Sequence, residues 1–229
     1  MFQSAFMKEE TGHLQTLKDI RSMMEKSSRF ISLSGLSGVA AGICALIGAV
    51  FARNVLGGVV MHSEDKSDSS HISRVPAGAI SLKEYMGSAL FQIAIGVIVA
   101  ALFFGFFFTY LRSRKTGVPI WGSQARRLLI NVSIPMIAGG IYLLKLIDNG
   151  NYGLIAPGCL LFYGLSLLNA SRYTLNEIRY LGYAEVLLGI ISLFFVGNGL
   201  FFWAIGFGVL HILYGAFMWW KYERAGDVN

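Results

Sequence analysis

The sequence predicts an all-α fold: a polytopic bundle of six transmembrane helices with both chain ends in the cytoplasm. Three features predict it, since 55% of the 229 residues are hydrophobic, only 14% are charged, and the apolar residues gather in long runs. A soluble domain of this size carries about a quarter charged residues, and a chain this apolar cannot cover its surface with polar groups in water. Lipid is therefore the solvent that fits the composition.

The membrane domain is predicted to cover residues 30–221. Runs of about 18 or more mostly apolar residues can cross a hydrocarbon layer of roughly 30 Å. Six such runs are present: about Phe30–Phe51, Tyr85–Leu111, Arg127–Ile147, Tyr152–Leu168, Tyr180–Val196 and Leu200–Trp220. The short segments 148–151 and 197–199 separate the last four runs and are rich in Gly and Asn. Because these residue types tolerate the left-handed conformation that ends a helix, we predict two tight helical hairpins.

The distribution of lysine and arginine predicts the orientation. About 14 of them lie in the N-terminal segment, in the 112–127 loop, after the fourth run and at the C-terminus, and about five lie on the other side. An excess of Lys and Arg marks the cytoplasmic side of a membrane. We therefore expect residues 1–29 and 222–229 to be cytoplasmic in a bacterial inner membrane. The net charge of +6 follows from this bias and does not indicate nucleic-acid binding.

The N-terminal segment, residues 10–30, has the pattern of an amphipathic helix. Its apolar residues recur at helical spacing between basic ones: Leu14, Leu17, Ile20, Met23 and Met24. Such a helix either lies on the inner leaflet, held by anionic lipid, or docks onto a protein partner or a second copy of the chain.

The outer loop, residues 52–84, is the only long connection between the predicted spans. It contains side chains of the kind that bind metals, among several serines: His62, Glu64, Asp65, Asp68 and His71. Their spacing matches no compact metal site. We expect a solvated loop and no metal centre.

Small residues predict where helices pack. In lipid, helices associate through close contact of small side chains, and Gly38 and Gly42 form such a ridge on the first span. The first span is therefore expected to be central in the bundle or to form a dimer. Pro135 lies inside the third span and cannot donate a hydrogen bond to the carbonyl of Asn131, so we expect a kink there.

Two ionisable residues lie within the predicted spans, where charge is costly and is usually functional. Glu185 lies about one turn inside the fifth span, and His211 lies near the middle of the sixth. Glu185 either pairs with an arginine (Arg127, Arg172 or Arg179) or binds a proton or cation. His211 is either a buried imidazole with satisfied hydrogen bonds or a ligand or proton relay. On straight spans the depths of the two side chains differ by several ångströms.

No enzymatic pattern is present. The sequence has no G-x-S-x-G, H-E-x-x-H or phosphate-binding glycine loop. Cys44 and Cys159 lie within apolar runs and make no C-x-x-C pair. We therefore expect no catalytic residues, no cofactor and no metal.

The stretch IRSMMEKSSRFISLSGLSG, residues 20–38, resembles the start of an uncharacterised family of six-span bacterial inner-membrane proteins. The resemblance implies the same topology and contributes no catalytic residues. The leading functional hypothesis is a non-enzymatic membrane protein that acts through a partner, as a regulatory or structural component. The alternative is a small transporter or channel that uses Glu185 and His211.

Overall fold

The computed structural model describes residues 34–64, 86–117 and 120–224. In this part of the chain all regular structure is helical. The elements are α2 (Gly35–Glu64), α4 (Ala89–Thr116), α5 (Ser123–Asp148), a 3₁₀ turn η1 (Tyr152–Leu154), α6 (Ile155–Ala170), α7 (Ile178–Leu193), α8 (Gly199–Trp203), a π-helical segment η2 (Ala204–Leu210) and α9 (His211–Tyr222). The last three follow one another without a break and form a single long helix, called the last helix below.

Five of these helices are long and apolar enough to cross a membrane: Gly35–Gly57, Ala89–Lys115, Ser123–Asp148, Tyr152–Ala170 and Gly199–Tyr222. The protein is thus a multi-pass helical membrane protein. The fifth expected span, Tyr180–Val196, coincides with α7, which has 16 residues and is about 24 Å long at 1.5 Å per residue. It falls short of the length of the other five.

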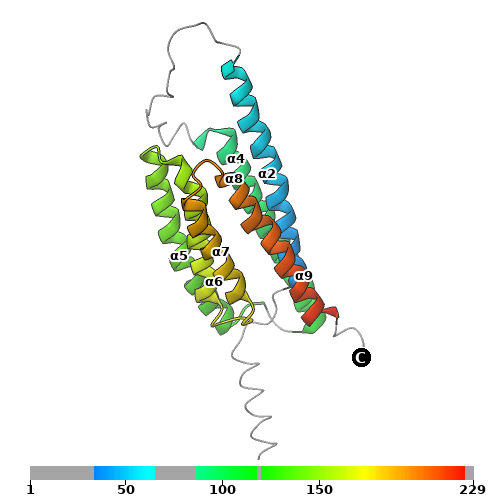
Figure 1. Cartoon of the computed structure of the whole chain (residues 1–229). Helices are drawn as coiled ribbons and strands as arrows, with labels where there is room; N and C mark the ends of the chain where they lie inside the picture. The colour runs from blue at the N-terminus through cyan, green and yellow to red at the C-terminus, as the bar shows by residue number, and fades with distance from the viewer. Residues whose placement is uncertain (1–33, 65–85, 118–119, 225–229) are drawn as a thin grey trace, which may run out of the picture.

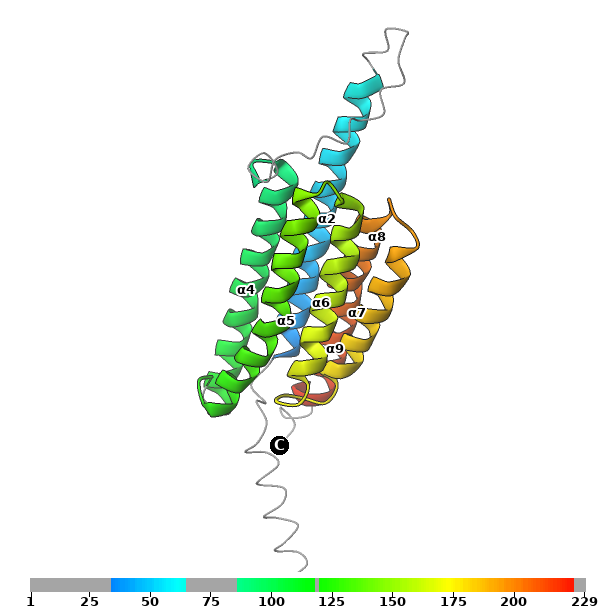
Figure 2. The same cartoon turned by 90° about the vertical axis from the view of Figure 1, so that its left-hand side faces the viewer.

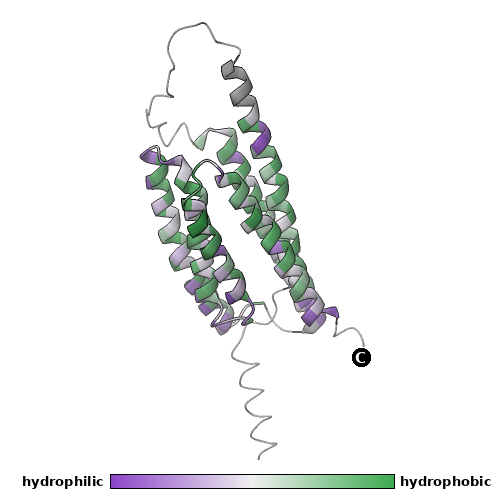
Figure 3. Ribbon diagram, viewed as in Figure 1, coloured by the Kyte–Doolittle hydropathy of each residue, from purple (hydrophilic) through white to green (hydrophobic). Residues whose placement is uncertain are grey.

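The helices lie side by side along one axis (Figure 2). Helix α2 packs against α4 and the last helix, and α6 packs between α5 and α7. Contacts of α8 with α6, and of the π-helical segment with α7, join these two groups. Hydrophobic residues cover the helices and hydrophilic residues gather toward their ends (Figure 3). We call the end at which α9 stops the lower end, as in Figure 1.

The predicted hairpins are confirmed. Gly150 ends the turn after α5 with a φ of 74°, and Gly197 lies before α8 with a φ of 109°. Backbone φ angles in this range favour glycine, since a Cβ crowds the chain there. Ser88 accepts a hydrogen bond from the Phe91 amide at the start of α4, and Gly117 (φ 68°) closes its other end.

The helix of the first span extends beyond the predicted end of that span at Phe51. Helix α2 continues through Glu64, so the first residues of the predicted 52–84 loop are helical. The residues that follow Phe51 include several apolar ones and no proline, so nothing in them breaks the backbone hydrogen-bond ladder. Residues 1–33, including the amphipathic 10–30 segment, lie outside the described residues, as does the remainder of the loop.

The glycine ridge of α2 lies against the last helix. A Cβ on Gly38 would stand 3.2 Å from the Cα of Gly215, and one on Gly42 would stand 2.7 Å from the carbonyl oxygen of Gly208. Ala45 on the same helix is also buried. Close backbone contact of this kind is what holds helices together in lipid. In this structure the ridge serves packing within the chain.

Pro135 lies inside α5, and a neighbouring helix satisfies the backbone group that it frees. The side-chain amide of Asn169, near the end of α6, donates a hydrogen bond of 2.8 Å to the carbonyl of Asn131. This carbonyl is the one that would otherwise bond to the amide at position 135. The proline thus leaves an acceptor through which α6 is attached to α5.

Replacing Asn169 with leucine is expected to lower the free energy of unfolding by about 1 kcal/mol, because the carbonyl of Asn131 loses its donor. The second change Pro135→Ala restores a backbone N–H to that carbonyl and is expected to recover most of the loss. Unfolding of the single and double variants in mixed micelles would measure both effects. Equal losses in N169L and in N169L/P135A would show that the two residues do not share this acceptor.

Candidate functional site

Helix α7 directs Glu185 into the bundle. Its buried residues recur every three or four positions, so they line one face: Ile178, Leu181, Gly182, Glu185, Gly189 and Ser192. Gly182 and Gly189 flank the carboxylate on this face and allow α6 to come close. A Cβ on Gly182 would stand 3.0 Å from the carbonyl oxygen of Gly164, and one on Gly189 would stand 3.1 Å from the amide nitrogen of Leu161. The Glu185 side chain has no exposed surface (0%).

His211 follows directly on the π-helical segment. Such segments are rare and occur frequently at functional sites. The Nδ1 atom of His211 lies 2.9 Å from the carbonyl oxygen of Gly206, and its Nε2 atom lies 2.7 Å from the hydroxyl of Tyr163 on α6. A carbonyl oxygen only accepts, so we assign the proton to Nδ1. With Tyr163 donating to Nε2, a neutral imidazole has both of its hydrogen bonds satisfied.

Glu185 and His211 meet in the bundle. Glu185 Oε1 lies 3.5 Å from His211 Nδ1, although straight spans would place the two side chains at different depths. The π-helical segment interrupts the regular α-helix, and both side chains reach several ångströms from their backbones. The Nδ1 proton already goes to Gly206, and neither oxygen of Glu185 has a hydrogen-bond partner among the described residues.

The expected pairing of Glu185 with an arginine is not found. No salt bridge in the described ranges joins Glu185 to Arg127, Arg172 or Arg179. Arg179 is exposed and instead donates a hydrogen bond to the hydroxyl of Tyr180. The reason is direction: Glu185 lies on the face of α7 that packs into the bundle, whereas Arg179 lies at the exposed lower end of the same helix.

Gly206 provides the space that the Glu185 carboxyl group occupies. A Cβ built on Gly206 would stand 2.6 Å from Glu185 Oε2 and would also overlap the side chain of Leu160. Leu160 is fully buried (0%). Apolar side chains and the glycine backbone thus border Oε2 of the carboxyl group, and the imidazole of His211 lies 3.5 Å from its Oε1.

The two helices that carry Glu185 and His211 hold two further buried polar atoms. The hydroxyls of Ser192 on α7 and Tyr214 on α9 have no hydrogen-bond partner within the described part of the chain. Ser192 is two helical turns from Glu185 toward the upper end, and Tyr214 is one turn from His211 toward the lower end. Sequence reasoning missed both residues and also missed Tyr163, because an isolated Tyr or Ser in an apolar run carries no signal of its neighbours.

A second polar cluster closes the lower end of the last helix. Lys221 lies 2.5 Å and the Tyr222 hydroxyl 2.6 Å from Oε1 of Glu177, which stands just before α7. Partial burial acts to raise the pKa of the Glu177 carboxyl group, but the hydrogen bonds from Lys221 and Tyr222 outweigh it and hold this pKa below its usual value. Glu177 is thereby kept ionised at neutral pH.

Glu223 joins three helices at the same end. Its carboxylate accepts a hydrogen bond of 2.5 Å from the backbone amide of Gly35 at the start of α2 and pairs with Arg112 near the end of α4 at 2.8 Å. A carboxylate at a helix N-terminus is favourable, because the first amides of the helix have no partners of their own. This contact fixes the lower ends of α2, α4 and α9.

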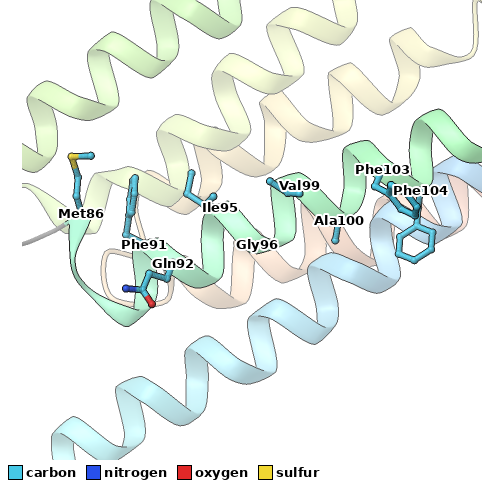
Figure 4. A pocket seen from close by; sticks show the side chains of 9 residues that line it. All are labelled: Met86, Phe91, Gln92, Ile95, Gly96, Val99, Ala100, Phe103 and Phe104. Carbon is cyan, nitrogen blue, oxygen red and sulfur yellow. The ribbon is translucent and has the colours of Figure 1, made fainter.

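A shallow apolar groove of about 650 Å³ lies along α4 (Figure 4). Residues of α4 and of the turn before it line it: Met86, Phe91, Gln92, Ile95, Gly96, Val99, Ala100, Phe103 and Phe104. Ile95, Val99 and Phe103 are exposed. Exposed apolar side chains on a spanning helix are what a lipid-facing surface requires. This groove is separate from the Glu185 site, since its lining comes from α4.

The described residues contain no group of three or more His, Cys, Asp or Glu side chains that could hold a metal ion. This statement does not cover the metal-binding residue types of the outer loop, because Asp65, Asp68 and His71 lie outside the described ranges. Comparison with protein-family models, curated proteins and solved structures finds no match. The chemistry of the Glu185 site therefore rests on its own geometry.

Proposed function

We propose that this protein is a small transporter or channel of the bacterial inner membrane and that it binds a proton within the bilayer at Glu185. The proposal includes six spans, with α7 as the short one, and both chain ends in the cytoplasm. The excess of Lys and Arg in the terminal segments and the 112–127 loop supports this orientation. The lower end of the bundle then faces the cytoplasm.

The Glu185 carboxyl group carries the proposal. It is fully buried, and it receives no hydrogen bond from any described residue. The imidazole beside it is satisfied in its neutral form by Gly206 and Tyr163. A carboxylate without donors or a paired cation is costly inside a bilayer. The arrangement therefore favours a bound proton on Glu185, with His211 positioned 3.5 Å away to exchange it.

A regulatory or structural role through a partner is the other hypothesis. It rests on the 10–30 segment, which would bind a cytoplasmic protein or a second copy of the chain, and it stays a prediction. Neither hypothesis requires catalytic residues or a cofactor. The buried acid–imidazole pair favours the transport hypothesis, because binding a partner at the cytoplasmic surface gives no reason to place an unpaired carboxyl group inside the membrane.

Infrared difference spectra of the protein in lipid nanodiscs would test the proposal directly. Exposed carboxyl groups stay ionised above about pH 6. In that range we expect a carboxylic C=O band to appear and disappear reversibly as the pH is changed, and Glu185→Gln to abolish it. In liposomes, the same variant is expected to lower proton flux driven by a pH gradient by about tenfold or more. Asp148→Asn, at an exposed carboxylate half of whose side-chain surface is accessible (51%), is the matched control and should change neither measurement.

An absent band would refute proton binding at Glu185, and a band that does not change with pH would refute reversible exchange of that proton. A titrating band together with equal proton flux in the native protein and in Glu185→Gln would refute transport while leaving the binding site intact.

A further inference from the structure

A buried hydroxyl group, that of Tyr214, lies below the proposed proton site and takes no part in the hydrogen bonds of that site. Tyr214 lies on the last helix between His211 and Tyr222. The spacing His211, Tyr214, Met218, Tyr222 advances by three or four residues at each step, so these side chains lie along one face of α9. His211 and Met218 are buried on this face. Tyr214 is thereby placed between the Glu185 site and the Glu177 cluster.

The Tyr214 hydroxyl has unused hydrogen-bonding capacity. Its oxygen is buried and has no hydrogen-bond partner among the described residues. Tyr163, Glu177 and Tyr222 are near enough to the Tyr214 hydroxyl for charges on these groups to influence one another. Native structures rarely leave such a group unpaired, and a functional role is one of the usual reasons.

We propose that Tyr214 relays protons between Glu177 at the cytoplasmic end and the Tyr163–His211–Glu185 site. The inference rests on the proposed function of Glu185 and adds the direction from which its proton arrives. The chain of groups is Glu177 with Tyr222, then Tyr214, Tyr163, His211 and finally Glu185. One link of the path has hydrogen-bond length, 2.7 Å between the Tyr163 hydroxyl and Nε2 of His211. At its start, the Tyr222 hydroxyl holds the Glu177 carboxylate by a hydrogen bond of 2.6 Å. The proposal includes a water molecule on either side of Tyr214, because its hydroxyl makes no direct hydrogen bond to a described residue.

The transfer balances without any change at the hydroxyl groups. A proton taken up by the Glu177 carboxylate passes to the Tyr214 oxygen as Tyr214 releases its own proton toward Tyr163. Tyr163 in turn gives its proton to Nε2 of His211, and the imidazolium that forms releases the Nδ1 proton to Glu185 Oε1. Each hydroxyl gives one proton and takes one, and the imidazole is neutral again with its proton on Nε2. A turn of the ring then returns that proton to the Nδ1 side before the next transfer.

The titratable groups near Glu185 are consistent with a proton that enters from the lower end of the bundle. Of the elements that pack against α7, α6 contains Tyr163 and Cys159, the last helix contains His211 and Tyr214 in its α9 part, and α8 and the π-helical segment contain no titratable side chain. On the upper side Ser192 is a hydroxyl that does not titrate in the physiological range. Tyr163 and His211, which are joined by a hydrogen bond, therefore belong to the path from the lower end.

The test is the rate at which the Glu185 carboxylic band appears after a rapid drop in pH, measured in nanodiscs that expose both membrane faces. We expect Tyr214→Phe to slow this rate by about tenfold or more and to leave the pH midpoint and amplitude of the band unchanged. Glu177→Gln is expected to slow it as well. Tyr180→Phe, at an exposed tyrosine on the same end of α7, is the control and should match the native rate.

The Phe variant removes only a hydroxyl that bonds to no described residue, so it is expected to fold with unchanged stability. A native rate in both Tyr214→Phe and Glu177→Gln would overturn the relay. Failure of the band to titrate in the native protein would instead refute the proton site itself, so the two proposals fail in distinguishable ways.

Discussion

A single methyl group at Gly215 is expected to lower the free energy of unfolding by about 3 kcal/mol, the upper part of the range for overpacking a tightly packed site. The Cβ of Gly215→Ala would stand 2.5 Å from the amide nitrogen of Val39 and 2.6 Å from the carbonyl oxygen of Gly35. Both atoms belong to the backbone of α2, and neither can rotate away. The two helices must therefore separate, which removes the close contact on which their association in lipid depends.

Reversible unfolding in mixed micelles, followed by tryptophan fluorescence, would measure this loss. Trp219 on α9 lies one turn from Gly215 and beside α2, where a Cβ on Gly35 would meet its backbone. Gly96→Ala is the matched control, because a Cβ at Gly96 in α4 meets no atom within 4 Å. Both changes gain the same helix propensity from the removal of a glycine. Equal stability of the two variants would show that α2 and the last helix are not in backbone contact.

The packing of α2 shows what a single sequence can and cannot specify. The small-residue spacing of Gly38 and Gly42 predicts a close contact, because only small side chains allow helices to approach in lipid. The partner of that ridge was not predictable. Gly208 and Gly215 lie in the last helix among many glycines of similar spacing, and the pairing of helices depends on the whole bundle. The spacing was therefore compatible with either a central helix or a dimer.

The helical segments were predictable where the sequence contains breaks. The turns at Gly150 and Gly197 follow from Gly and Asn between apolar runs, and Lys145 pairs with Asp148 at 2.6 Å as their spacing of three residues suggests. The end of α2 was not predictable from hydropathy, which decreases after Phe51 while the helix continues. Polarity marks where a helix leaves the lipid, whereas only caps, glycine turns and prolines end its hydrogen bonds.

The two ionisable residues of the site could be predicted from the sequence, but the residues that surround them could not. Glu185 and His211 stand out because charge inside a bilayer is costly. Their contact, the π-helical segment before His211 and the role of Gly206 depend on how α6, α7 and the last helix lie against one another. A 3.6-residue period fixes the face of an α-helix, but the π-helical segment changes that period locally. The depths inferred for straight spans therefore placed the two side chains too far apart.

Gly206→Ala is expected to lower the free energy of unfolding by about 2 kcal/mol and to displace the Glu185 carboxyl group. The new methyl group would stand 2.6 Å from Oε2, in a space that Leu160 and the carboxyl group already fill. Leu160 can turn the end of its side chain aside, whereas the carboxyl group also has the imidazole of His211 3.5 Å from its Oε1. The same unfolding measurement would give the loss, and the carboxylic infrared band of Glu185 would shift.

Two double variants separate the carboxyl group from the other neighbours of Gly206. Glu185→Ala removes the overlapping atoms, so G206A is expected to cost about 1 kcal/mol less in that background than in the native protein. Glu185→Gln keeps an amide of the same shape in the same place, so the full cost of G206A should remain. If Gly206→Ala is equally destabilising in all three backgrounds, the carboxyl group does not lie against this glycine. Its approach to His211, and with it the proton site, would then be wrong.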